Sequence, residues 1–475
     1  MSTKQPGYEL DSESDIHINT SLSGDPFILS DLDMTMPDTL VTPFVIYNLP
    51  PHHNAQFIVD SFQRGLDEAV KQLPSLAAKI IFDGCRKPQR RMKPGVLKLT
   101  VRQFGPGQHK SYAELAENYF SPSELDHLKL MPGTAYADTT ERPLCILQLN
   151  FIPGGIILAF GFNHVPLDMA SMDLAISLVT KCIQTQMDDS PLEFTPVTFD
   201  RKPLAASSKL ASLPRAKLLE QTSDYQVCNT AATINQPSSK ALENKNCVNK
   251  GVVYRISNSN TKRLKQACQP LNGIAKYVST YDCVVGLLWK SVMRVRATNN
   301  TDLNDRLSRL LHPVSLRNRP GSEIPESYFG NALSVASAGP VPIKQLTGPS
   351  GLSVAASHIR KSVEGTSQNS IGHVTALSST MGPSEKMQYQ PPGLLEENFL
   401  VTSWHSAHAA TWDFGLGAPQ MVRTWVLPMP GCAVVFPDCN PQPNERVYDC
   451  FVILPEAEQD MLSQDVEMNT WFQIQ

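Results

Sequence analysis

The sequence lacks several features that would assign it to other classes of protein. Its 475 residues contain no run of about 18 apolar residues, the length that a membrane-crossing helix needs, and residues 1–7 show no charged-then-apolar signal pattern. Its ten cysteines include no Cys-x-x-Cys pair, so we interpret them as reduced residues and not as a zinc or disulfide framework. The net charge of −4 offers no strongly basic face for nucleic acid. We therefore expect a soluble, cytoplasmic protein that binds neither membranes nor nucleic acid.

The length and the local composition predict two domains. A chain of 475 residues exceeds what one hydrophobic core usually supports. Residues 1–26 are polar and are expected to be a mobile segment, and residues 216–250, rich in Asn, Ser, Thr, Gln and Lys over most of their length, are expected to be a crossover linker. The two domains would then span residues 27–215 and 251–475, each of mixed strand and helix.

The most informative stretch surrounds His164 and Asp168. Residues 155–163 form an apolar run typical of a strand buried on both faces, and the apolar positions that follow Asp168 recur at helical spacing. Pro166 lies between them and forbids a continuous helix, so His164 is predicted to occupy a tight strand-to-helix turn. Imidazole titrates near neutral pH and can take a proton from an alcohol and return it later. His164 is therefore the candidate general base.

The His-x-x-x-Asp spacing is weak evidence when taken alone. In a chain with eleven histidines and aspartate at ordinary frequency, the number of such spacings expected by chance is about one half. Asp168 is open to two interpretations: it could orient His164 as in a hydrolase triad, or it could hold the turn by pairing with an arginine from elsewhere in the chain. The sequence contains no Gly-x-Ser-x-Gly elbow, which disfavours a hydrolase with a serine nucleophile.

Four further motifs lie in the second half of the sequence. They are Leu316-Arg317-Asn318-Arg319-Pro320, Ser327-Tyr328-Phe329-Gly330-Asn331-Ala332, Leu400-Val401-Thr402-Ser403-Trp404 and Asp413-Phe414-Gly415-Leu416-Gly417. In their order and spacing after His164, these motifs resemble those of the BAHD superfamily of coenzyme A-dependent acyltransferases. The resemblance is closer to its fungal branch, which includes trichothecene 3-O-acetyltransferases, and it runs from about Leu29 to about Met468.

The resemblance implies a fold and an activity. The fold class would be α/β (α+β mixed): two chloramphenicol acetyltransferase-like domains, each a mixed sheet with flanking helices, with a channel between them and a short C-terminal piece that returns to the first sheet. The activity would be O-acyl transfer, most simply O-acetyl transfer, from acyl-CoA to a hydroxyl of a secondary metabolite, with His164 as general base in a direct ternary complex. Acyl-CoA would be a co-substrate, and we expect no bound cofactor, no metal and a monomer.

The resemblance also assigns roles to the residues around the turn. Asp413 joins His164 in the predicted catalytic set, although in the family its loop is remote from the reacting atoms and shapes the site through Gly415 and Gly417. Asp168 matches a family residue that pairs with an arginine, here Arg317, which favours the second interpretation of Asp168.

Other positions match the family's channel and its coenzyme A site. Thr402 and Trp404 are expected to lie along the channel and to donate to the forming oxyanion, with a core role as the alternative for Trp404. Ser279 and Thr280 match a position near coenzyme A, and Ser279 also suits the N-cap of a helix. A basic stretch with Lys262, Arg263 and Lys265 could meet a phosphate, but a solvated helix face is the better interpretation.

Some positions depart from the family pattern. Leu416 replaces a tryptophan and Met169 replaces a frequent glycine, yet neither change removes a proton carrier. Asn163 stands where condensation domains of peptide synthetases carry a second histidine, so that related family fits less well. His405 and His408 have loose metal spacing, but no third ligand is evident and zinc is disfavoured.

Three other functions remain open from the sequence. The same site could acylate an amine, and a catalytically silent protein could keep the fold to bind coenzyme A or a metabolite. Hydrolysis of an ester or thioester is disfavoured, because nothing marks a dedicated water-activating nucleophile. The identity of the acceptor cannot be read from the sequence, because its pocket would be built from loops.

Overall fold

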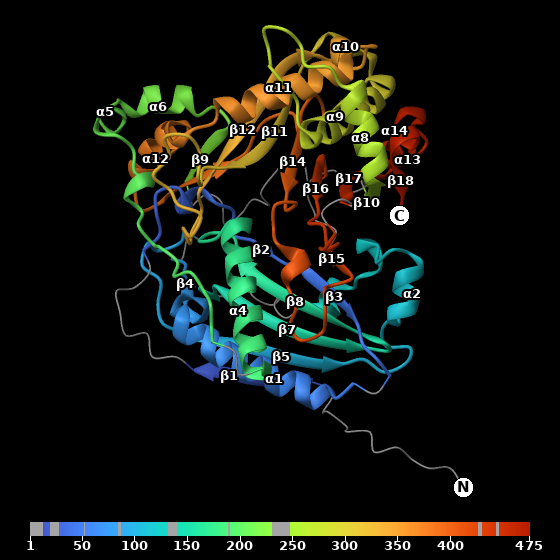
Figure 1. Ribbon diagram of the computed structural model, residues 1–475. Helices are drawn as coiled ribbons and strands as arrows, with labels where there is room; N and C mark the ends of the chain where they lie inside the picture. The colour runs from blue at the N-terminus through green and yellow to red at the C-terminus, as the bar shows by residue number, and fades with distance from the viewer. Residues whose placement is uncertain are drawn as a thin grey trace.

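The computed structural model describes residues 13–19, 28–51, 53–83, 87–131, 140–188, 191–229, 248–425, 430–442 and 446–475. Over these residues the chain forms two halves, each built on a mixed seven-stranded sheet with helices packed against it (Figure 1). The predicted pair of mixed sheets is therefore confirmed. Within the same residues, no helix is long and apolar enough to cross a membrane.

The first sheet is centred on the hairpin that leads to the His164 turn. β7 and β8 pair antiparallel and are buried at every position, as their continuous apolar runs predict. The strands, in spatial order, are β1 (Glu13–Asn19), β5 (Val96–Gln103), β7 (Cys145–Ile152), β8 (Gly155–Asn163), β3 (Phe44–Asn48) and β15 (Met421–Arg423), and β2 (Leu40–Val41) also pairs with β8.

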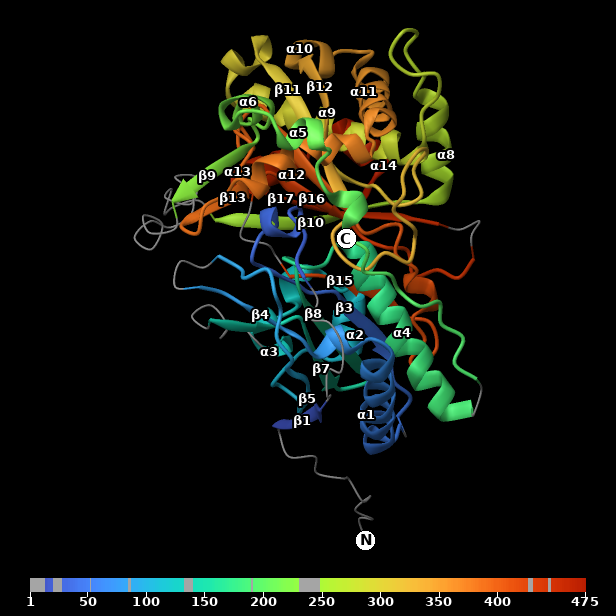
Figure 2. The ribbon, with the colours of Figure 1, turned by 90° about the vertical axis from the view of Figure 1, so that its left-hand side faces the viewer.

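Two long helices cover one face of the first sheet. α1 (Ala55–Gln72) and α4 (Met169–Asp188) lie side by side there (Figure 2) and share a hydrophobic core with the sheet. The side chain of Asn54 caps α1 by accepting the N–H of Phe57 at 3.0 Å. The short helices α2 (Tyr112–Glu117) and α3 (His127–Leu130) contribute to a smaller core on the opposite face.

The second sheet carries its own core on the face that is turned away from the first sheet. Helices α9 and α11 pack on each other and on this face. The strands, in spatial order, are β12 (Leu333–Pro342), β11 (Leu307–Ser315), β14 (Phe399–Ser403), β16 (Cys432–Val435), β17 (Tyr448–Pro455), β10 (Asn249–Ile256) and β18 (Gln473–Ile474). The helices are α8 (Asn258–Ala267), α9 (Thr280–Asn299), α10 (Ile343–Leu346), α11 (Gly351–Gly365), α13 (Glu456–Ser463) and α14 (Val466–Trp471).

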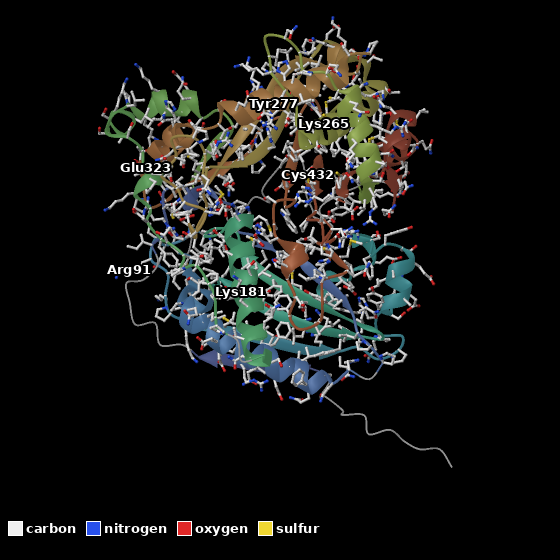
Figure 3. The ribbon with its side chains drawn as sticks, in the orientation of Figure 1. Arg91, Lys181, Lys265, Tyr277, Glu323 and Cys432 are labelled. Atoms are coloured by element: carbon white, nitrogen blue, oxygen red, sulfur yellow. The ribbon has the colours of Figure 1, made fainter. Side chains whose placement is uncertain are left out.

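The other face of the second sheet is turned toward the first half. Its cluster includes Trp404, Phe436 and Cys432, the last labelled in Figure 3, and Val41 and Met169 of the first half pack against it. The chain end also crosses between the halves, because β15 pairs antiparallel with β3 in the first sheet. This strand is the returning piece that the family resemblance implied.

The expected mobile segment over residues 1–26 must be corrected for residues 13–19. These residues form β1, which pairs antiparallel with β5 along its whole length. Ile18 is buried in the first core and Ile16 packs against it, so one face of the strand is apolar. Only two apolar residues in seven left this strand hard to recognise among polar neighbours. The rest of the expected segment, residues 1–12 and 20–26, lies outside the described residues.

The expected linker over residues 216–250 also contains regular structure. α6 (Arg215–Gln221) packs with α5 (Ser208–Ala211) and α12 (Gly372–Ser379), and β9 (Tyr225–Asn229) pairs with β13 (Glu385–Tyr389). Residues 230–247 of the expected linker lie outside the described residues. A further small sheet joins β4 (Lys79–Ile81) and β6 (Glu141–Pro143).

Candidate active site

The predicted base stands at the junction between β8 and α4. β8 ends at Asn163 and α4 begins at Met169, so the turn between them holds His164. The side-chain oxygen of Asn163 accepts the N–H of Val165 at 2.9 Å, and the N–H of His164 donates to the carbonyl of Thr39 at 2.9 Å. These bonds fix the backbone where the strand ends. The predicted strand-to-helix turn is therefore present.

The imidazole of His164 is arranged as a neutral base. Its Nδ1 lies 2.9 Å from the carbonyl oxygen of Leu167. Because a carbonyl can only accept, we assign the ring proton to Nδ1, and the lone pair of Nε2 remains to receive another proton. Burial lowers the pKa of His164, and this outweighs the opposing effects of the backbone hydrogen bonds and the Asp168 charge. The ring is thus unprotonated near neutral pH, which is the state that a general base requires.

Asp168 pairs with an arginine from the other half of the molecule. Its carboxylate accepts two parallel bonds from the guanidinium of Arg317, at 2.8 and 2.9 Å, and two backbone N–H groups, from Ser171 at 3.0 Å and Ala332 at 2.9 Å. Burial raises the pKa of Asp168, but Arg317 and the backbone donors lower it by more, so its net pKa is below the usual value. The triad arrangement is not formed, because Nδ1 of His164 is bonded to Leu167.

The guanidinium of Arg317 joins three segments at once. Besides Asp168 it donates to the carbonyls of Tyr328 and Gly330, at 3.0 and 2.8 Å, and to Oγ of Ser171 at 3.0 Å. Ser171 lies on α4, and its Oγ also accepts the N–H of Gly330 at 2.9 Å. Arg317 thereby ties the Ser327–Ala332 motif to the start of the helix that follows the His164 turn.

Two buried residues with no predicted role complete this arrangement. Nδ2 of Asn331 donates to Asp33 and to the carbonyl of Val165, both at 2.8 Å. Burial raises the pKa of Asp33, although Arg201 and Asn331 oppose the rise. Asn331 lies in a motif that carried the family resemblance and Asp33 lies within the span of that resemblance. The two residues are 298 positions apart, and nothing local in the sequence indicates that they meet.

The carboxylate of Asp413 is engaged within its own loop, and its predicted place in the catalytic set stays a prediction. One of its carboxylate oxygens accepts the N–H groups of Gly415, Leu416 and Gly417, at 2.9, 3.0 and 2.8 Å. Both glycines have positive φ, 78° and 81°, which side chains disfavour. Over the described residues no hydrogen bond or ion pair joins Asp413 to His164. The carboxylate of Asp413 shapes its own loop, as the family resemblance implied for the motif as a whole.

The Asp413 loop is anchored to the first half by an aromatic side chain. Phe414 is buried in the first core, where it stacks on Phe62 and Phe160 with ring centroids 5.3 and 5.7 Å away. The segment that connects the second sheet to the first therefore rests on α1 and the central strands of the first sheet.

Thr402 and Trp404 lie at the interface between the halves. Thr402 is half-buried on β14, and Trp404, which follows the strand, is 6% exposed and packs edge-on against Phe436 at 6.1 Å. Met169, the first residue of α4, packs against the same cluster. In the described part of the chain, neither Oγ1 of Thr402 nor the indole N–H of Trp404 makes a hydrogen bond. Both donors remain available, and their role toward an oxyanion stays a prediction.

Ser279 and Thr280 begin α9 in the second half. Oγ of Ser279 accepts the N–H of Asp282 at 3.2 Å, and Asp282 accepts the N–H of Ser279 at 2.6 Å, which is a capping box. The capping role is confirmed, whereas contact with coenzyme A stays a prediction. Lys262, Arg263 and Lys265 are exposed on α8, where Figure 3 labels Lys265.

The two histidines with loose metal spacing have other partners. Nδ1 of His408 lies 2.7 Å from a carboxylate oxygen of Asp173, and the ring of His405 stacks on Tyr448 with centroids 4.0 Å apart. Among the residues that the structure describes, no three His, Cys, Asp or Glu side chains are grouped so that they could hold a metal ion.

A cavity of about 340 Å³ lies between the halves, but it includes none of the predicted site residues. It is lined by Met34, Asp83 and residues 87–90 of the first half and by Ser378, Met381, Pro383 and residues 385–387 of the second half. The polar groups on its wall are largely engaged with protein: Nζ of Lys87, for example, donates to the carbonyl of Gly382 at 2.6 Å.

Family models match most of the chain. The model described as "Transferase family" matches residues 113–469, and the model described as "Trichothecene 3-O-acetyltransferase-like N-terminal domain" matches residues 41–182. The first match covers the Ser327–Ala332, Leu400–Trp404 and Asp413–Gly417 motifs, and both cover His164 and Asp168.

Curated relatives and a solved structure are similar to the chain over different lengths. Enoyl-CoA isomerase/hydratase claC of Penicillium crustosum is 25% identical over 71% of this chain, which spans only 38% of that relative. Acyltransferase easC of Emericella nidulans is 24% identical, and the match covers 87% of this chain and 89% of that protein. The crystal structure of F. graminearum TRI101 complexed with coenzyme A and deoxynivalenol has a TM-score of 0.79 and 19% identity, over 95% of this chain and 100% of that one.

Proposed function

This chain belongs to the transferase family, as BAHD-type acyltransferases do, and from that premise we propose that it is an acyl-CoA-dependent O-acyltransferase. The acyl group is most simply acetyl, and the acceptor is a hydroxyl group of a secondary metabolite. We propose that coenzyme A and a small acceptor occupy the site together, since F. graminearum TRI101, to which the chain is similar, forms a complex with coenzyme A and deoxynivalenol. No acyl-enzyme is required.

The observation that carries the proposal is the state of His164. Its Nδ1–H is committed to the carbonyl of Leu167, which leaves Nε2 as the acceptor, and burial lowers its pKa so that the ring is neutral at physiological pH. A neutral imidazole held in one orientation at the end of a core strand is suited to remove a proton from an alcohol.

The proposed reaction proceeds in two steps. Nε2 of His164 takes the proton of the acceptor hydroxyl while its oxygen attacks the thioester carbonyl carbon, which forms the new C–O bond and a tetrahedral oxyanion. The oxyanion then collapses, the C–S bond breaks, and the departing coenzyme A thiolate takes the proton back from His164. The hydroxyl of Thr402 and the indole N–H of Trp404 are the donors that we assign to the oxyanion, a contribution that is often worth a few kcal/mol.

The remaining site residues hold this arrangement in place. Asp168 pairs with Arg317 and holds the turn in place. Because Asp168 is not bonded to the ring of His164, the proton remains on His164 and does not pass to Asp168. Ser279 and Thr280 at the start of α9 are proposed to contact coenzyme A, because helix N-termini present N–H groups and partial positive charge to phosphates.

The test is the release of free thiol from acetyl-CoA by the purified protein without any acceptor, where water takes the acceptor's place. We expect slow release by the wild type and a loss of roughly 100- to 10,000-fold in His164→Ala, the range of a positioned proton carrier. His373→Ala serves as the control, since His373 is a half-buried histidine of α12 outside the site.

Either negative result would overturn a different part of the proposal. Equal release by wild type and His164→Ala would remove His164 from its role as base. If the wild type releases no thiol and calorimetry detects no binding of coenzyme A, the transferase activity fails and a silent binding protein becomes the better description. Once release is established, acceptors with hydroxyl and amine groups distinguish O-acyl from N-acyl transfer.

A further inference from the structure

The segment between β14 and β15 crosses from the second sheet to the first and carries both Trp404 and the Asp413 loop. Ala409, Trp412 and Phe414 of this segment are buried in the core of the first half. Apolar packing alone leaves such a segment free to slide by small amounts, because dispersion contacts are not directional. Hydrogen bonds are directional, so any that join this segment to the first half would fix its position.

One carboxylate makes several directional bonds to this segment. Oδ1 of Asp173 accepts the backbone N–H of His408 at 3.1 Å and the indole N–H of Trp412 at 3.0 Å. Its Oδ2 lies 2.7 Å from Nδ1 of His408. Asp173 is 6% exposed and Trp412 is fully buried, whereas the side chain of His408 is 69% exposed. A buried carboxylate with three donors from one segment is not explained by the sequence motifs.

The position of Asp173 relates these bonds to the site. Asp173 lies on α4, five residues after Asp168, and so on the helix that begins at the His164 turn. The carbonyl of Trp404 accepts the N–H of Ala407 at 2.9 Å, which closes a tight turn from Trp404 to Ala407, and His408 follows this turn directly. A bond from α4 to His408 therefore constrains where Trp404 stands relative to the helix.

We propose that Asp173 is a positioning residue for acyl transfer: its carboxylate clasps residues 404–412 onto α4 and so sets Trp404 relative to His164. This inference rests on the proposed function, since it assigns Trp404 a place beside the reacting acyl group. Asp173 itself contacts no substrate. We call the three bonds from His408 and Trp412 to Asp173 the Asp173 clasp.

The Asp173 clasp responds to pH through His408. The hydrogen bond and charge of Asp173 on α4 raise the pKa of His408, and Glu326 on the loop between β11 and β12 adds to the rise. A raised folded-state pKa means that the added stability is present at low pH and fades as pH rises through that pKa. The clasp persists above it, because a neutral ring can still donate one N–H and the other two bonds do not titrate.

Amide hydrogen exchange measures the clasp directly, since the N–H of His408 is itself bonded to Asp173. In Asp173→Ala we expect exchange at residues 404–412 to rise by roughly 3- to 10-fold relative to wild type. Asp173→Asn keeps the shape of the side chain, and its amide can still accept with its oxygen and donate to a neutral His408 ring. At pH 8.5, residues 404–412 of this variant should therefore be as protected from exchange as in wild type. The Asn variant lacks the charge that raises the pKa of His408. At pH 5, below the ordinary imidazole pKa of about 6.5, its amide faces a protonated ring, and protection should fall toward that of Asp173→Ala.

His408→Gln gives the matching test from the other side. Its exchange rate divided by that of wild type at the same pH should be larger at pH 6 than at pH 8.5, because only the wild type gains a charged partner on acidification. Intrinsic exchange rates cancel in this ratio. Asp67→Asn, at an exposed aspartate of α1, is the control and should leave residues 404–412 unchanged.

Thiol release from acetyl-CoA then tests the effect on the reaction. A positioning residue predicts a fall in kcat of roughly 3- to 30-fold in Asp173→Ala, with less than a threefold change in KM for acetyl-CoA and recovery in Asp173→Asn at high pH. A merely structural role would lower the melting temperature of both variants without this recovery of kcat.

Three outcomes would overturn the inference at different points. If the N–H of His408 exchanges at the same rate in Asp173→Ala as in wild type, no clasp exists. Faster exchange with unchanged kcat would show a clasp without a positioning role. If the wild type neither releases thiol nor binds acetyl-CoA, the proposed function fails and the positioning role fails with it, while the exchange data still report on the clasp itself.

Discussion

The two motif aspartates, Asp168 and Asp413, have the same functional group and stabilise the molecule in different ways. Asp168 is 4% exposed and binds a guanidinium that comes from the other half of the chain. Asp413 is half-exposed and binds three backbone N–H groups of its own loop. The first carboxylate joins distant segments through charge, whereas the second shapes a turn that is local in sequence.

The comparison shows why motif membership does not by itself assign a catalytic role. Both aspartates stand in motifs that resemble the same family, yet neither is bonded to His164. Removing the partner of a buried charge leaves an uncompensated ion, whereas removing a half-exposed cap leaves backbone groups that water can reach. The two aspartates should therefore differ in how much stability depends on them.

The largest effect is expected when the buried ion pair is broken from the arginine side. Arg317→Ala leaves Asp168 buried without its main partner and also removes the bonds to Tyr328 and Gly330. We expect the free energy of unfolding to fall by about 3–5 kcal/mol, measured as a shift of the urea midpoint. The control is Arg306→Ala, an exposed arginine paired with Glu396, which should give no measurable shift. A fall below about 1 kcal/mol for Arg317→Ala would mean that the two halves do not depend on this pair.

Acid should weaken the same pair, by less than the loss of Arg317. The folded-state pKa of Asp168 lies below its unfolded value, so its stabilising effect is present above the unfolded value of about 3.9 and is lost as pH falls through the folded one. Asp33 acts in the opposite direction, because burial raises its pKa and the folded state then retains the proton. Between pH 5 and 3, wild type should lose stability more steeply than Asp168→Asn, as urea unfolding at each pH would measure. Parallel curves would contradict this.

The effect at Asp413 is expected to be smaller still. Asp413→Ala leaves the N–H groups of residues 415–417 without their acceptor, and by analogy with the loss of a helix cap we expect a fall of about 1 kcal/mol in the free energy of unfolding. Asp413→Asn keeps an oxygen acceptor, so its free energy of unfolding should fall by only a few tenths of that amount. Thiol release should be retained in Asp413→Asn, whereas a loss as large as that of His164→Ala would show that Asp413 belongs to the catalytic set.

Features that depend on residues close in sequence could be predicted. The apolar run of β8, Pro166 and the helical spacing after Asp168 are local signals, and together they indicated the turn that holds His164. The pairing of Asp168 with Arg317, 149 positions away, was reached only through the family resemblance. Spacing alone left Asp168 open to two interpretations.

Features that depend on tertiary packing could not be predicted. β1 has few apolar residues of its own and becomes a strand because β5 offers an edge. Asn331 and Asp33 meet only after both halves have folded, and Asp173 on α4 finds His408 and Trp412 from 235 positions or more away. No periodicity or motif of a single sequence records such contacts.

The smallest effect is expected at Leu416, where this chain departs from the family's tryptophan. Asp413 accepts the backbone N–H of Leu416 at 3.0 Å. Any residue except proline supplies this N–H. Leu416 is half-buried and packs against the first core, so a larger ring can lie along the same surface. We expect Leu416→Trp to change the free energy of unfolding by no more than about 1 kcal/mol and to leave thiol release within threefold of wild type. A tenfold change in kcat would mean that the loop acts on the site through the side chain at position 416. The contrast between Asp168, which links distant segments through charge, and Asp413, which only shapes its own loop, would then no longer hold.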